Sequence, residues 1–243
     1  MLVFSLLIGI ILFYIVPVVG AVVLMRRKKG AGRAFLFGIL AFSVSQLLMR
    51  VPILTVVLPR FAWFGVLQLS PWAYGIFLGL TAGLFEEIAR WIAIHFFLKG
   101  RTDFEHGLAF GLGHGGIENM ALIGPNYIAT LITVLAGQGA LLGDIGGASV
   151  FISVGERLYA VAFHVGASLL VMNGIRKGRA LLYLLAAVVL HTVMDAAVVI
   201  LPTVFGAGVA GVEIWGAVVG ILTLLLGVLC YRGKGGKLEG LAD

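Results

Sequence analysis

The sequence predicts an all-α fold, a polytopic transmembrane bundle of about seven spans in a single integral membrane domain over residues 1–243. Of the 243 residues, 61% are hydrophobic and only 12% are charged, whereas a soluble domain carries about 25% charged residues. Apolar stretches of about twenty residues recur, each long enough to cross a hydrocarbon layer as a helix. Lys and Arg gather in short clusters between these stretches, which is typical of cytoplasmic loops.

The apolar stretches define the expected helices in order along the chain. They cover residues 2–25, 34–58, 72–98, 104–124, 157–174, 180–201 and 208–231. The first lacks a basic leading region and ends at a run of basic residues, which favours a retained span over a signal peptide. Segment 127–154 is apolar but rich in Gly, Ser and Thr. We expect a re-entrant or surface-lying hairpin there, with an eighth span as the alternative.

Four basic clusters predict the orientation of the helices. They lie at residues 26–33, 99–101, 176–179 and 232–237. Seven spans place all four clusters in the cytoplasm and the N-terminus outside. We therefore expect a multi-pass protein of a prokaryotic plasma membrane with a cytoplasmic C-terminus. The net charge of +6 does not indicate nucleic-acid binding, because these basic residues do not form one folded face.

Glycine recurs at every fourth position of the third and fourth expected helices. The two ladders are Gly75, Gly79 and Gly83, and Gly107, Gly111 and Gly115. Small residues at this spacing let two helices approach closely. One further step along the first ladder leads to Glu87, so a neighbouring helix backbone is expected beside an acidic side chain.

Ionisable and amide side chains interrupt the apolar stretches between about residues 72 and 201. They are Glu86, Glu87, Arg90, His114, Glu118, Asn119, His164, His191 and Asp195. Three pairs are four residues apart, so the members of each pair share one helix face: Glu86 with Arg90, His114 with Glu118, and His191 with Asp195. Ionisable groups are costly in hydrocarbon, and those within spans usually face a protein interior and mark function. We expect them to share one cavity.

A carboxylate beside imidazoles suits the activation of water, so these residues predict hydrolysis of a peptide bond in a membrane-embedded or hydrophobic substrate. The same side chains suit zinc, with His114, Glu118, His164 and His191 as the candidate ligands. A proton- or ion-coupled transporter is a further alternative, as is a scaffold that binds partner helices. No HExxH motif is present, and Ser168 and Asp144 lack the glycines of the serine and aspartyl intramembrane protease motifs.

Three motifs in order resemble a known superfamily. Residues 85–90 read Phe-Glu-Glu-Ile-Ala-Arg, residues 110–114 read Phe-Gly-Leu-Gly-His, and residues 191–195 read His-Thr-Val-Met-Asp. They resemble the EExxR, FxxxH and HxxxN/D motifs of the CAAX-protease and bacteriocin-processing (CPBP, or Abi) superfamily. With His-Gly-Gly-Ile-Glu-Asn at 114–119 and Phe-His at 163–164, the pattern is similar to the YhfC family of glutamic-type intramembrane proteases.

The resemblance covers about residues 72–200 and implies a metal-free mechanism. In that mechanism Glu86 activates water, Glu87 and Arg90 orient it, and His114 hydrogen-bonds in the cavity. His191 and Asp195 complete the site, with Glu118, Asn119 and His164 in support. No cofactor is then expected, and zinc is the alternative. Asp stands at position 195 where the prenyl-protease members typically have Asn, and an ionised Asp only accepts hydrogen bonds.

Overall fold

The computed structural model describes residues 1–143 and 145–232, and the regular elements in these ranges are all helices. The α-helices are α1 (Leu2–Ile10), α2 (Val16–Arg27), α3 (Ala31–Phe42), α4 (Ala62–Gln68), α5 (Pro71–Ile92), α6 (Phe104–Glu118), α7 (Gly124–Leu135), α8 (Gly147–Arg176), α9 (Ala180–Val204) and α10 (Val209–Arg232). The π-helical stretches are η1 (Ile11–Ile15), η2 (Ser43–Arg50), η3 (Ile53–Val57), η5 (Ala93–Phe97) and η6 (Asn119–Ile123), and the 3₁₀ turns are η4 (Leu58–Arg60) and η7 (Gly139–Leu142).

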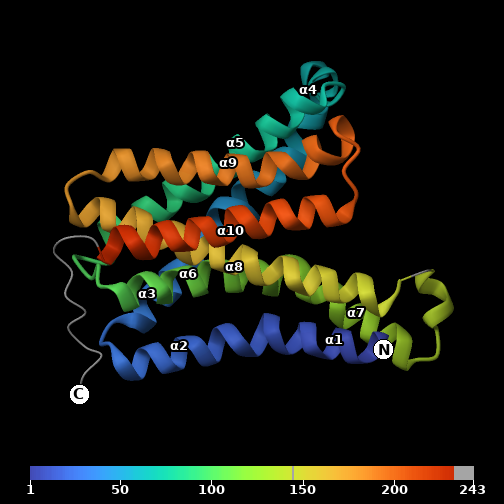
Figure 1. Ribbon diagram of the computed structural model, residues 1–243, viewed down its shortest axis with the longest axis horizontal. Helices are drawn as coiled ribbons and strands as arrows, with labels where there is room; N and C mark the ends of the chain where they lie inside the picture. The colour runs from blue at the N-terminus through green and yellow to red at the C-terminus, as the bar shows by residue number, and fades with distance from the viewer. Residues whose placement is uncertain (144, 233–243) are drawn as a thin grey trace.

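Several of these elements follow one another directly and form long helical segments, which lie together as a bundle in Figure 1. Within the described residues, five helices are long and apolar enough to cross a membrane: Leu2–Arg27, Ala31–Arg60, Gly147–Arg176, Ala180–Val204 and Val209–Tyr231. Two further long segments carry other residues of the predicted site: α5 with η5 carries Glu86, Glu87 and Arg90, and α6 with η6 and α7 carries His114 and Glu118. The fold is therefore the polytopic helical bundle that the sequence predicts.

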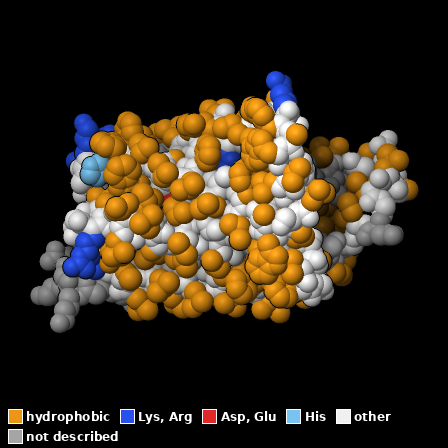
Figure 2. All heavy atoms as spheres, turned by 90° about the horizontal axis from the view of Figure 1, so that it is seen from above, with side chains coloured by type: hydrophobic (Ala, Val, Ile, Leu, Met, Phe, Trp, Pro, Cys, Tyr) orange, Lys and Arg blue, Asp and Glu red, His pale blue; other side chains and the backbone are white. Residues whose placement is uncertain are grey.

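The outer surface of the bundle is apolar over its middle. Figure 2 shows one face on which hydrophobic side chains dominate and most Lys and Arg side chains lie toward the ends. Large exposed side chains such as Leu48, Leu182, Val198 and Leu229 belong to this surface. A contiguous apolar surface of this extent is unfavourable in water, and in a membrane it contacts lipid.

The structure corrects the interpretation of segment 127–154 as a hairpin separate from the long helices, because its described residues extend two of them. The fourth long segment continues as α7 to Leu135, and α8 begins at Gly147 rather than at residue 157. Leu6 of α1 and Phe13 of η1 pack in one apolar cluster with Tyr127, Val150 and Val154 of these extensions. The Tyr127 ring lies edge-on against Phe13 with 4.9 Å between centroids, and its hydroxyl joins the two extensions by donating to the Val150 carbonyl over 3.1 Å. Position 144, whose Asp entered the motif comparison, lies outside the described residues.

Three of the basic clusters meet at one end of the bundle (Figure 1). Lys28 pairs with Asp103 at 2.8 Å, which joins the turn after α2 to the start of α6. Lys177, in the turn after α8, donates to the carbonyl of Cys230 over 3.1 Å. In the fourth cluster, residues 233–237 lie outside the described residues. This common end agrees with the prediction that the clusters share one side of the membrane.

The glycine ladder of α5 sets how closely α9 approaches. A Cβ added at Gly79 would lie 2.5 Å from the Thr192 carbonyl oxygen, and one added at Gly83 would lie 2.9 Å from the Val188 carbonyl oxygen. Both distances are far below ordinary contact, so only glycine permits this packing. The ladder brings His191 of α9 against Glu87 of α5, as the spacing predicts.

The ladder of α6 acts in the same way on α8. A Cβ at Gly111 would lie 2.4 Å from Cα of Val165, and one at Gly115 would lie 3.1 Å from Cα of Val161. Gly113 lies on another face of α6, where a Cβ would approach the Phe35 carbonyl of α3 to 2.1 Å. The short α6 is thus held close to α3 and α8, and its His114 comes within reach of both.

Candidate active site

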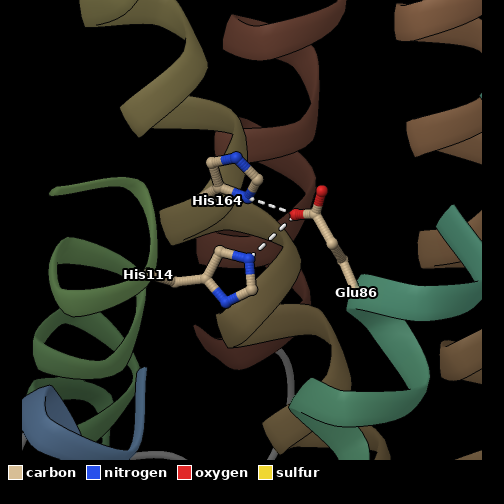
Figure 3. A group of neighbouring side chains, drawn as sticks. All are labelled: Glu86, His114 and His164. Carbon is tan, nitrogen blue, oxygen red and sulfur yellow. Dashed lines mark hydrogen bonds and ion pairs between the residues drawn. The ribbon is translucent and has the colours of Figure 1, made fainter. Parts of the chain in front are cut away.

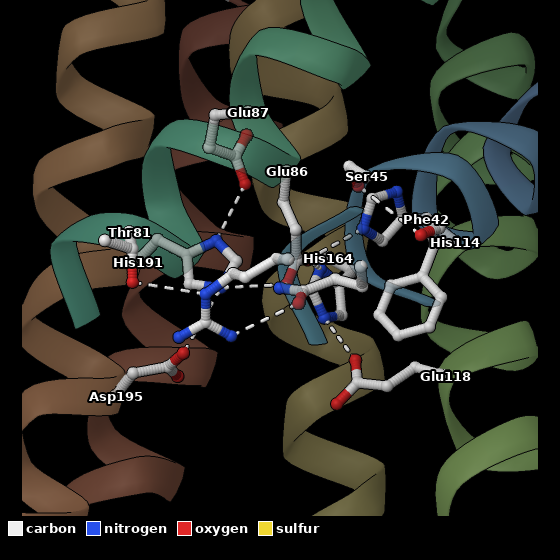
Figure 4. A network of polar contacts seen from close by, with 12 residues as sticks. Phe42, Ser45, Thr81, Glu86, Glu87, His114, Glu118, His164, His191 and Asp195 are labelled. Atoms are coloured by element: carbon white, nitrogen blue, oxygen red, sulfur yellow. Dashed lines mark hydrogen bonds and ion pairs between the residues drawn. The ribbon is translucent and has the colours of Figure 1, made fainter. Parts of the chain in front are cut away.

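Most of the predicted site residues lie where α5, α6, α8 and α9 meet inside the bundle (Figure 4). Glu86 and Glu87 come from α5, His114 from α6, His164 from α8 and His191 from α9. All five side chains are buried. The structure therefore brings together groups that are separated by up to about a hundred positions in the sequence.

The carboxylate of Glu86 lies at the centre of this cluster. One oxygen, Oε2, is 2.9 Å from His114 Nε2 and 3.9 Å from His164 Nδ1. The other, Oε1, accepts a hydrogen bond from the Gln46 side-chain amide and is 3.7 Å from His191 Nε2. None of these partners is a permanent cation, so the negative charge of Glu86 is balanced by histidines, by more distant charges or by a bound cation.

Glu87 is paired differently, with a buried arginine. Arg90 Nε and Nη2 donate to its two oxygens over 2.8 and 3.1 Å, and neither side chain of this pair is exposed to solvent. Arg90 Nη1 donates to the His164 carbonyl over 3.1 Å and to the Ser168 hydroxyl, while Nη2 contacts His164 Nδ1 at 3.1 Å. All five N–H groups of the guanidinium thus have partners. This pair is a rigid support, since breaking a buried ion pair costs about 3–5 kcal/mol.

Ser168 takes part in this support and not in a nucleophilic arrangement. Its hydroxyl donates to the His164 carbonyl over 2.7 Å and accepts from Arg90. A nucleophilic serine gives its proton to an adjacent general base, whereas the Ser168 hydroxyl donates to a backbone carbonyl. The contacts of Ser168 therefore agree with the sequence-based argument against Ser168 as a nucleophile.

A chain of contacts fixes the tautomer of His164. Because an arginine only donates, the Nδ1 atom that faces Arg90 is the acceptor. The proton then sits on Nε2, which donates to Glu118 Oε2 over 2.6 Å. Arg157 Nη1 holds the other oxygen of Glu118 over 3.0 Å. An imidazole held by a carboxylate on one nitrogen presents the other nitrogen in a defined direction.

His191 is oriented in a similar way. Its Nδ1 is 3.0 Å from Glu87 Oε1, and a carboxylate partner places the proton on Nδ1. The Nε2 atom then points between Glu86 Oε1, at 3.7 Å, and Asp195 Oδ2, at 3.6 Å. The side chain of Asp195 is 39% exposed, so it lies at the open side of the cluster.

A cavity of about 250 Å³ opens beside these groups. Glu86, Glu118, His164, His191 and Asp195 line its polar part. Phe163, Met194, Val198 and Trp215 line its apolar part. A water molecule occupies about 30 Å³ in the liquid, so the cavity has room for several waters or for part of a peptide.

Glu86, His114 and His164 fit a metal ion by donor type and by position (Figure 3). Each offers one donor atom, and these atoms lie within 4.8 Å of one another. Two histidines and one glutamate form a common ligand set of catalytic zinc, and Glu118 holds the second nitrogen of His164 as the hydrogen-bond partner of a zinc ligand does. Among the described residues, His114 Nδ1 has no such partner.

The structure therefore brings together only some of the zinc ligands predicted from the sequence. His114 and His164 are in the converging group, but Glu118 lies behind His164, and Glu86 takes the carboxylate position. His191 stands to one side of Glu86. Asn119, predicted as a supporting residue, is buried on η6 outside the cavity lining.

Three residues that contact the cluster were missed by sequence reasoning. Gln46 and Arg50 lie on η2, and Arg157 lies on α8. A signal was present for the first two, because they are polar, four residues apart and inside an apolar span. Arg157 was hidden because the expected fifth helix began at that position and an arginine at a helix end is unremarkable.

The fold and the site together define a polytopic membrane protein with a buried glutamate–histidine cluster. The family model described as YhfC intramembrane metalloprotease matches residues 11–142 and 139–219. A Bacillus subtilis (strain 168) protein, described as "Uncharacterized membrane protein YhfC", is 32% identical over 232 residues, which cover 87% of this chain and 89% of that protein. No solved structure matches this chain. The chain belongs to the YhfC family.

The family description bears on the question of a metal. The resemblance in sequence favoured a metal-free site, and this preference is not supported. The family is described as a metalloprotease family, and three donors of the right kind converge on one point.

Proposed function

We propose that this chain hydrolyses peptide bonds inside the membrane, with Zn²⁺ held by Glu86, His114 and His164. The observation that carries the proposal is the convergence of these three buried donors beside a cavity. Such an ion, when bound, activates water for attack and polarises the carbonyl to be cleaved. A buried site within apolar spans suits a substrate that is itself hydrophobic or membrane-embedded.

The surrounding residues then have defined tasks. Glu118 and Arg157 hold His164, and Glu87 and Arg90 hold His191 and the α8 backbone. Water oxygen forms a bond to the peptide carbon, the carbon–nitrogen bond breaks, and a proton reaches the leaving nitrogen. The Nε2 atom of His191 faces the cavity, and we assign it to carry that proton.

One contact favours a second candidate, the metal-free chemistry implied by the CPBP resemblance. Arg90 Nη2 is 3.1 Å from His164 Nδ1, so a cation at that nitrogen must displace an arginine. Without a metal, Glu86 takes the proton from water, and His114 holds its Oε2 atom. The two mechanisms share Glu86 and differ in their need for zinc.

The test is a survey of new protein termini in cells that express the wild type, Glu86→Gln or the control Glu105→Gln. Glu105 lies near the start of α6, outside the site. We expect fragments cut in or near apolar segments with the wild type and the control, and none with Glu86→Gln. Identical termini in all three, with the proteins folded and expressed, would overturn the proposal and favour ion or solute transport.

Metal analysis of the purified active protein separates the two mechanisms. The zinc proposal expects about one zinc ion per chain, with activity lost on chelation and regained with added zinc. Full activity at negligible metal content would exclude zinc and leave Glu86 as the base that activates water.

A further inference from the structure

We propose that Gln46 and Arg50 form a positioning pair for Glu86, an inference that rests on the proposed function. The Gln46 side chain is buried, and its amide nitrogen donates to Glu86 Oε1. Its amide oxygen accepts from Arg50 Nη1 over 3.2 Å. Gln46 thus connects a cation to the central carboxylate of the site.

The orientation of the Gln46 amide follows from its two neighbours. Arg50 only donates hydrogen bonds, so the atom facing it is the oxygen. An ionised Glu86 only accepts, so the atom facing it is the nitrogen. Because the two constraints agree, the amide has one favourable orientation and holds Oε1 in place, while Oε2 faces His114 and His164.

Arg50 is itself anchored on α5, the helix that carries Glu86. Its Nη2 donates to the Leu78 carbonyl over 2.7 Å, and its Nε donates to the Thr81 hydroxyl over 3.2 Å. These partners are neutral, so its charge is left to act on the carboxylates of Glu86 and Asp195. Glu87 has Arg90 and Glu118 has Arg157; for Glu86, the corresponding cation acts through Gln46.

The local helix geometry and the packing of α3 place this pair. Gln46 and Arg50 lie in the π-helical stretch η2, and such stretches are frequent at functional sites. The close contact of Gly38 with the Phe110 carbonyl, 2.1 Å from an added Cβ, holds α3 against α6. Gln46 does not line the cavity, so it acts on the reaction through Glu86 and not by touching substrate.

The test compares purified full-length variants in the cleavage of casein that carries self-quenching fluorophores, so that cleavage is measured as a rise in fluorescence. Gln46→Met removes both hydrogen bonds, and Gln46→Glu keeps the partner of Arg50 but removes the donor to Glu86. We expect kcat/KM to fall about 10–100-fold in each variant, as for other hydrogen-bond partners of site residues. The loss should appear in kcat, with KM changed less than about threefold. Ser45→Ala is the control, because within the described part of the chain the Ser45 hydroxyl bonds only to the backbone carbonyls of Ala41 and Phe42.

Two further measurements separate positioning from general structural support. Arg50→Met should lower kcat/KM, but Arg50→Met combined with Gln46→Met should be no worse than Gln46→Met alone, because Arg50 acts through Gln46. Affinity for zinc, measured by competition with a chromogenic chelator, should also fall about 10–100-fold in Gln46→Glu.

Each outcome decides a different question. A folded Gln46→Glu variant with wild-type kcat/KM, or additive losses in the double variant, would overturn this inference while leaving the proposed function intact. A wild type that produces no new protein termini in cells and binds no zinc would overturn the proposed function and this inference with it.

Discussion

The ladder of glycines on α5 makes a quantitative prediction for the site. A Cβ at Gly79 would lie 2.5 Å from the Thr192 carbonyl oxygen, while ordinary contact begins at 3.4 Å. The substitution Gly79→Ala therefore requires α9 to move away by about 0.9 Å, the difference between these distances. If His191 moves with α9, its 3.0 Å contact with Glu87 lengthens to about 3.9 Å, which is no longer a hydrogen bond.

The expected result is a large loss of activity with a moderate loss of stability. Misplacement of a reacting group by about 1 Å can cost about 100-fold in rate, and overpacking costs about 1–3 kcal/mol of the free energy of unfolding. We would measure kcat on labelled casein and the thermal unfolding midpoint in detergent. Gly155→Ala is the matched control, because no neighbouring atom of residues 1–143 or 145–232 lies within 4 Å of a Cβ added there.

The outcome that refutes the reasoning is specific. A folded Gly79→Ala variant with kcat within about twofold of the wild type would show that the close approach of α5 and α9 does not set the site geometry. A fall in the unfolding midpoint without a fall in kcat would lead to the same conclusion, since the ladder would then serve packing alone.

Two further predictions concern the support of His164 and the orientation of the chain. Arg157→Met leaves Glu118 without its cation, so Glu118 holds His164 less firmly and we expect kcat to fall about 10-fold or more. Arg157→Lys keeps the charge and should lower kcat less. Equal kcat in the wild type and Arg157→Met would contradict this. A cysteine introduced at Leu141 should react with an impermeant thiol reagent added outside bacterial cells, and one in the Arg176–Arg179 turn should react only after lysis, as the basic clusters predict. The reverse pattern would place the N-terminus in the cytoplasm.

The sequence by itself determined the fold class and most of the cluster. Hydropathy and the basic turns are local properties, and a helix needs no distant partner to cross a membrane because its backbone hydrogen bonds are internal. The costly polar residues within apolar spans indicated which side chains form the buried cluster, since such residues persist mainly where a protein interior satisfies them. The i, i+4 pairs and the ladder leading to Glu87 also indicated which helix faces would meet.

Only the tertiary structure decided which partners these residues have. Gln46 and Glu86 are 40 positions apart, and Arg90 and His164 are 74 positions apart, so their contacts depend on which helices are neighbours. The same holds for segment 127–154, whose composition suggested a hairpin but whose helices are extended by packing against α1 and η1. Local pattern determines that a residue is buried, whereas the packing of the bundle determines what it is buried against.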